Sequence, residues 1–90
     1  MTHEFSLLAG LLARVEEIAR SEAASSVTRV SVRLGALVGC SPEHLREHFV
    51  DAARGTVAEG AELAVDARAD PLEPHAAEVL LDSVEIEIDR

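Results

Sequence analysis

The sequence contains no lysine, so its eight basic residues are all arginine, against 17 aspartate and glutamate residues. The formal net charge is −9 with histidine counted as neutral. A chain this acidic repels phosphate backbones and anionic lipid headgroups, which argues against nucleic acid and membranes as partners. Metal ions, cationic ligands and basic protein surfaces remain compatible with the charge.

Cysteine is nearly absent, because Cys40 is the only one in the chain. A single cysteine excludes a disulfide framework and a thiolate zinc site built within one chain. We interpret Cys40 as a small, half-buried residue at a loop end rather than as a metal ligand.

Long apolar runs are absent too. No stretch approaches the roughly 18 apolar residues that span a membrane. The apolar segment 5–12 lacks the basic leader of a signal peptide. We therefore expect a cytoplasmic protein.

The only aromatic residues besides histidine are Phe5 and Phe49, so a core would consist mainly of Ala, Val, Leu and Ile. The length predicts a single domain over residues 1–90. A domain of this size buries a modest fraction of its surface, so we expect its stability to depend on docking to a partner or on forming a homodimer.

Two segments have the spacing of amphipathic helices. In residues 6–24, apolar side chains recur at intervals of three and four: Leu7, Leu8, Leu11, Leu12, Val15, Ile18 and Ala19. In the second segment, Ser41 is the expected N-cap, Pro42 suits the first helical position and Glu43 complements the dipole. Arg54 and Gly55 predict its end. Its expected buried face consists of Leu45, Phe49, Ala52 and Ala53.

Three segments alternate between apolar and polar residues, as half-buried strands do. They are residues 27–34, 62–68 and 79–89, and the expected inward residues are Val30, Val32, Leu34, Leu63, Val65, Ala67, Val84, Ile86 and Ile88. Residues 69–77 contain two prolines and predict a linker. The order α-β-α-β-β favours an α+β fold with two layers: a three-stranded mixed sheet with both helices on one face.

The N-terminal residues Met1, Thr2, His3 and Glu4 are the candidate metal site. A free α-amine followed closely by histidine can wrap a square-planar ion with the amine, deprotonated backbone amides and the imidazole. Such nitrogen donors suit Ni(II) or Cu(II) rather than Zn(II). With Met1 retained, the chain end provides four nitrogens up to the His3 imidazole. With Met1 removed, Thr2 provides the amine, and Glu4 can add its amide or carboxylate.

Other candidate ligands are weaker. His44 and His48 are four residues apart on the second helix, a spacing that can hold a metal, but they alternate with Glu43 and Glu47 and favour a solvated polar face. His75 lies in the linker. The sequence contains no Ser-His-Asp arrangement, phosphate-binding glycine loop or basic patch, so we do not expect an enzyme.

Several segments, in order, resemble the hydrogenase nickel-incorporation metallochaperones, the HypA/HybF family. The opening Met-Thr-His-Glu-Phe-Ser-Leu is similar to the family's Met-His-Glu-Phe-Ser-Leu, with Thr2 inserted. The resemblance continues through residues 27–37, Pro42-Glu43-His44-Leu45, Phe49 and residues 55–63, and resumes at residues 83–87.

The resemblance implies a carrier that delivers Ni(II) to the large subunit of [NiFe]-hydrogenase, and sometimes to urease, together with a nickel-handling GTPase. The family's histidine ligand of nickel corresponds to His3, and the following glutamate to Glu4. If Met1 is cleaved, His3 returns to the family's second position.

The sequence departs from the family at residues 69–77, which occupy the place of a zinc domain with two Cys-x-x-Cys pairs. We therefore expect no structural zinc. Two alternatives to nickel carriage follow: a metal-independent interaction module that docks on hydrogenase-maturation proteins, or a copper-binding terminus.

Overall fold

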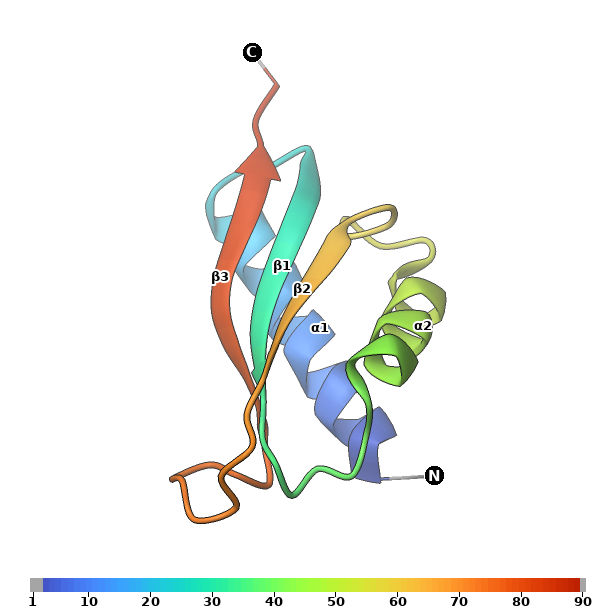
Figure 1. Cartoon of the computed structure of the whole chain (residues 1–90). Helices are drawn as coiled ribbons and strands as arrows, with labels where there is room; N and C mark the ends of the chain where they lie inside the picture. Colours follow the sequence, from blue (N-terminus) through green and yellow to red (C-terminus); the bar gives the residue numbers. More distant parts are fainter. Residues whose placement is uncertain (1–2, 90) are drawn as a thin grey trace.

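The structure is a computed structural model, which describes the backbone of residues 3–89 and the side chains of residues 6–89. Its elements are α1 (His3–Ser21), β1 (Ser26–Leu34), α2 (Pro42–Ala53), β2 (Glu62–Ala67) and β3 (Val79–Glu87). Both helices pack against one face of the sheet (Figure 1). The predicted order and two-layer α+β architecture are therefore confirmed.

The sheet is mixed, as the sequence predicts, with the spatial order β2-β1-β3. The central strand β1 pairs in parallel with β2, and α2 forms the crossover between these two strands. On its other side β1 pairs antiparallel with β3. Within the part of the chain that the structure describes, each outer strand has a single neighbour, so each leaves one edge of the sheet without a strand partner.

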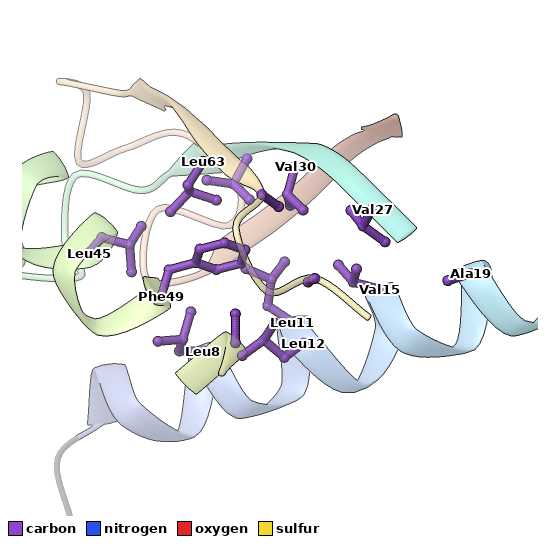
Figure 2. Close-up of a cluster of buried hydrophobic side chains, with 14 of the residues drawn as sticks. Leu8, Leu11, Leu12, Val15, Ala19, Val27, Val30, Leu45, Phe49 and Leu63 are labelled. Carbon is purple, nitrogen blue, oxygen red and sulfur yellow. The ribbon is translucent and has the colours of Figure 1, made fainter. Parts of the chain in front are cut away.

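The core lies between the sheet and the helices (Figure 2). Phe49 reaches from α2 into the space between α1 and β1 and is 1% exposed. The other large buried side chains are Leu8, Leu11, Leu12, Val15, Val27, Val30, Val32, Leu34, Leu45 and Leu63. These are mostly the apolar positions that the helical and strand periodicities predict.

The central strand buries one residue that simple alternation does not predict. Val27 and Val30 are both buried although three positions separate them. The pairing of β1 with β3 shifts register between Val27 and Arg29, and again between Ser31 and Val32. A bulge of this kind inserts an extra residue and reverses the side-chain phase, which brings Val27 onto the core face.

Several predicted boundaries and positions are wrong. The first helix spans His3–Ser21 rather than 6–24: Phe5, three residues before Leu8, extends the apolar spacing toward the N-terminus, and the chain turns after Ser21, where Ala23 has a positive φ of 54°. Ala67 is exposed, since it is the last residue of a strand at the edge of the sheet. Ile88 is 50% exposed and lies outside β3, because β3 ends at Glu87, the partner of the first residue of β1.

Residues 68–78 connect β2 to β3 through turns. Arg68 anchors the start of this connection with ion pairs to Glu73 (3.2 Å) and Asp66 (3.1 Å). The hydrogen bond to Glu73, followed by the charges of Glu73 and Asp66, raises the pKa of Arg68 above its ordinary value, so the guanidinium stays charged. That this connection stands in place of the family's zinc domain remains a prediction.

Candidate metal centre

The predicted ligands lie at the start of α1. Met1 and Thr2 are outside the described residues, and so are the side chains of His3 and Glu4. His3 is the first residue of α1, and Glu4 is the second. The amine–amide–imidazole chelate therefore remains a prediction, but its histidine belongs to a helix rather than to a segment that precedes one.

A helix start suits a chelate that uses backbone nitrogen. The first four N–H groups of an α-helix have no acceptor within the helix. A metal that takes the amide nitrogens of His3 and Glu4 would therefore break no intrahelical hydrogen bond. The N-terminal end of the helix dipole is positive and favours the negative charge of a deprotonated amide.

The first half of α1 is fixed against α2. Leu8 is 2% exposed and lies beneath Phe49 of α2 (Figure 2). Leu11 and Leu12 continue the same buried stripe. The candidate ligands thus precede a segment that the core holds in place.

The structure brings His44 and His48 together on α2. Their Nε2 atoms are 2.6 Å apart, and their rings stack with centroids 4.5 Å apart and planes inclined by 18°. His44 is exposed and His48 is half-buried. The spacing identifies this pair in the sequence, but nothing in the sequence indicates that the two Nε2 atoms converge.

The remaining candidates have ordinary local partners. His75 has a positive φ of 65° and its Nδ1 contacts the Glu78 carboxylate. The Cys40 thiol is half-buried and donates to the carbonyl of Ser41 at 3.4 Å. Among side chains that the structure describes, no three His, Cys, Asp or Glu residues gather closely enough to hold an ion. Within the same described residues, no helix is both long and apolar enough to cross a membrane.

The comparison with protein families matches residues 1–73 to the model described as "Hydrogenase/urease nickel incorporation, metallochaperone, hypA". The hydrogenase maturation factor HypA of Chlorobium limicola is 44% identical over 64 residues, which cover 71% of this chain and 55% of that protein. The hydrogenase maturation factor HypA of Aquifex aeolicus is 45% identical over 64 residues, covering 71% and 56%. The chain thus spans about half the length of these curated relatives.

The fold is similar to that of a solved structure, the nickel metallochaperone HypA from Helicobacter pylori. The TM-score is 0.77 at 17% identity, and the match covers 98% of this chain and 100% of that one. A second solution structure of a HypA protein matches with a TM-score of 0.74 at 18% identity, covering 97% and 98%. At these identities the likeness supports the shared fold.

Proposed function

Because the chain belongs to the HypA family of hydrogenase and urease nickel-incorporation metallochaperones, we propose that it binds Ni(II) at its N-terminus and carries the ion to a nickel enzyme under assembly. The observation that supports this most is the family match, which spans residues 1–73 and therefore includes His3. The metal is cargo in this role, and the chain acts as a carrier rather than as an enzyme.

The proposed donors are the terminal amine, the backbone amides that follow it and the His3 imidazole. Glu4 would add its amide or carboxylate if Met1 is removed and Thr2 provides the amine. Four nitrogens in a plane favour Ni(II) over Zn(II), which prefers a tetrahedral set. The start of α1 at His3 supports this arrangement, since the first amides of a helix are not used inside it.

Calorimetric titration of the untagged chain with Ni(II) tests the site. We expect one tight equivalent per chain and the visible absorption of square-planar nickel. The His3→Ala variant should bind nickel more than about 100-fold more weakly, because loss of a ligand should exceed the 10- to 100-fold cost of losing a supporting residue around a metal site. Extra residues ahead of Met1 should also weaken binding, since they displace the amine.

The control is His75→Ala, which removes a histidine far from the N-terminus in sequence without touching the proposed donors. Its nickel affinity and spectrum should match those of the parent chain. Equal nickel affinity in His3→Ala and parent would refute the assignment of the site. An intact mass of apo and nickel-loaded chain establishes whether Met1 or Thr2 carries the amine.

We propose the large subunit of [NiFe]-hydrogenase as recipient, with a nickel-handling GTPase as co-worker. The relatives are hydrogenase maturation factors by name, which supports this choice. Nickel-loaded parent chain should transfer its ion to the apo large subunit, and His3→Ala should not. A complex that forms equally well with all metal chelated, and that transfers no nickel, would instead favour the metal-independent interaction module.

We also infer that the residues of this chain hold no structural zinc. Structural zinc sites use four ligands that are mostly thiolates. Cys40 is the only cysteine, and its thiol is engaged with the backbone of Ser41. Nickel binding in this chain would then proceed without coupling to a zinc site of its own.

A further inference from the structure

The paired imidazoles of His44 and His48 present two nitrogen donors at one point on the surface of α2. One helical turn separates the residues, and the two Nε2 atoms are 2.6 Å apart. Stacking of the rings at 4.5 Å keeps both Nε2 atoms on the same side. The arrangement is that of a bidentate ligand, because i and i+4 residues are neighbours on a helix surface.

Two Nε2 atoms this close to each other need a proton or a metal cation between them, because two nitrogen lone pairs repel each other. A neutral imidazole carries one N–H and one lone pair. When one of the rings carries its proton on Nε2, that N–H donates to the Nε2 of the other ring. If both rings carry their proton on Nδ1, two lone pairs point at the same place, and only a cation relieves their repulsion. A divalent metal ion can take the place of the shared proton, which is then released.

The dimensions fit such an ion. Two histidine nitrogens at about 2.0–2.1 Å from an ion are about 3.4 Å apart at the tetrahedral angle that zinc prefers, and about 3.0 Å apart at the right angle of a square-planar ion such as Cu(II). The observed separation of 2.6 Å is shorter than the square-planar value by a few tenths of an ångström. Metal binding would therefore require the two Nε2 atoms to move slightly apart.

The fold holds the two residues in this register. The Ser41 hydroxyl caps α2 by accepting from the backbone N–H of His44 at 3.1 Å. Leu45 and Phe49, which directly follow the two histidines in sequence, are each 1% exposed in the core. Because these neighbours fix the rotation of α2, the imidazoles stay on its outer side and need little ordering when a ligand binds.

We propose that His44 and His48 form a second metal-binding site, which takes a late first-row divalent ion such as Cu(II), Zn(II) or Ni(II). Imidazole nitrogens prefer these ions to Mg²⁺ and Ca²⁺, which prefer oxygen. Two imidazoles leave coordination positions open on such an ion, so the bound ion stays exchangeable. Its two donors are not among those proposed for the N-terminal chelate, so each set of donors can be tested without the other. It lies in the same half of the molecule as the start of α1, since α2 runs beside the first half of that helix (Figures 1 and 2).

The test removes the N-terminal chelate first. The His3→Ala chain with an acetylated N-terminus is titrated with CuCl₂, ZnCl₂ and NiCl₂ in separate experiments. We expect one equivalent per chain, with Cu(II) bound most tightly. Replacing either histidine, His44→Ala or His48→Ala, should weaken binding at least tenfold, because one imidazole is a poorer ligand than two. NMR spectra of the acetylated His3→Ala chain should show the signals of both imidazoles, His44 and His48, shifting together as ZnCl₂ is added.

His75→Ala in the same background is the matched control, and its affinity should be unchanged. Circular dichroism of each variant checks that α2 is still formed. His44→Gln provides a second variant with a polar side chain at the exposed position, and it should lose affinity as His44→Ala does. Equal affinity in the His44 and His48 variants and their parent would overturn the proposal, and so would zinc-induced shifts confined to His75. Neither result would bear on nickel binding at His3, which the untagged chain tests.

Discussion

Among single residues, Gly35 has the tightest surroundings of any glycine in the chain. A Cβ built at this position overlaps the carbonyl group of Ala76 and approaches the carbonyl oxygen of Glu78 to 2.9 Å. The same segment is bonded to the end of β1, because Gly35 N donates to Glu78 O at 3.0 Å and Leu37 N donates to Ala76 O at 2.8 Å. Absence of a side chain therefore lets the connection 68–78 close onto β1.

Gly35→Ala should destabilise the protein by about 1–3 kcal/mol, the usual cost of forcing atoms into a filled space. Gly10→Ala is the matched control, since nothing lies within 4 Å of a Cβ placed there and the residue occupies the interior of α1. That substitution should stabilise by about 0.5–1 kcal/mol through helix propensity. Urea unfolding of the three proteins measures both values. Equal effects of the two substitutions would contradict the packing at Gly35.

Single residues also differ in how far the sequence alone predicts them as metal ligands. His3 is a weak metal signal by itself, and it becomes the first candidate because the segments around it and along the chain resemble the HypA family. The pairing of His44 and His48 does not stand out, because their spacing is equally typical of a solvated face. Whether two imidazoles converge depends on their side-chain rotamers, and these require coordinates.

At the scale of elements, α2 is the segment whose local sequence agrees best with its structure. Ser41 caps it, Pro42 occupies the first turn, and the chain leaves it at Arg54 and Gly55, where φ of Gly55 is +77°. All of these features are predicted from the residue types alone, because caps and turns depend on local chemistry.

Removing the cap tests how much that local chemistry contributes. Ser41→Ala should cost about 1 kcal/mol, because it leaves the His44 N–H without its side-chain acceptor. Ser41→Asn should restore most of the stability, since the asparagine oxygen can accept the same bond. Thermal and urea unfolding measure the difference. A loss in Ser41→Asn as large as in Ser41→Ala would indicate that the capping bond is not what stabilises this end of α2.

Strand boundaries are less predictable than this helix, because they depend on partners elsewhere in the chain. Ile88 continues the alternation of Val84 and Ile86, yet β3 stops at Glu87, where its partner β1 begins. Val27 breaks the alternation of Val30 and Val32, yet a bulge places it in the core. Sequence periodicity predicts which apolar residues lie on the same face of a strand, whereas strand pairing determines which of them are buried.

At the scale of the whole molecule, the acidic residues outnumber the arginines that could pair with them, which leaves a net charge of −9. Most of the described arginine ion pairs, including Arg29 with Glu62 (3.3 Å) and Arg33 with Asp82 (3.4 Å), are exposed. Pairs of this kind contribute about 0–1 kcal/mol each, so they do little for stability. The excess negative charge instead raises the local concentration of cations around the protein. Both proposed metal sites would benefit from this field without needing acidic ligands of their own.

The two proposed metal sites should differ in how strongly they couple to folding. All donors of the N-terminal chelate lie within the first few residues, so an unfolded chain can form nearly the same chelate. The Nε2 atoms of His44 and His48 converge only while α2 is helical. A ligand stabilises a fold only to the extent that it prefers the folded state, and binding to the unfolded state reduces the effect.

We therefore expect metal binding to stabilise two variants of the chain, each with a free N-terminus, to different extents. In His3→Ala, a metal at 100 times its dissociation constant from the His44–His48 site should stabilise the fold by up to about 2.7 kcal/mol. In the double variant His44→Ala/His48→Ala, nickel at the N-terminus should bind more tightly than a metal binds at the His44–His48 site. It should nevertheless change the free energy of unfolding by less than about 0.5 kcal/mol, because the folded and the unfolded chain both bind it. Thermal unfolding with and without each metal measures the two shifts. A large nickel-dependent rise in Tm for the double variant would mean that the N-terminal site recruits donors from the folded domain, and the chelate would then need ligands beyond the first four residues.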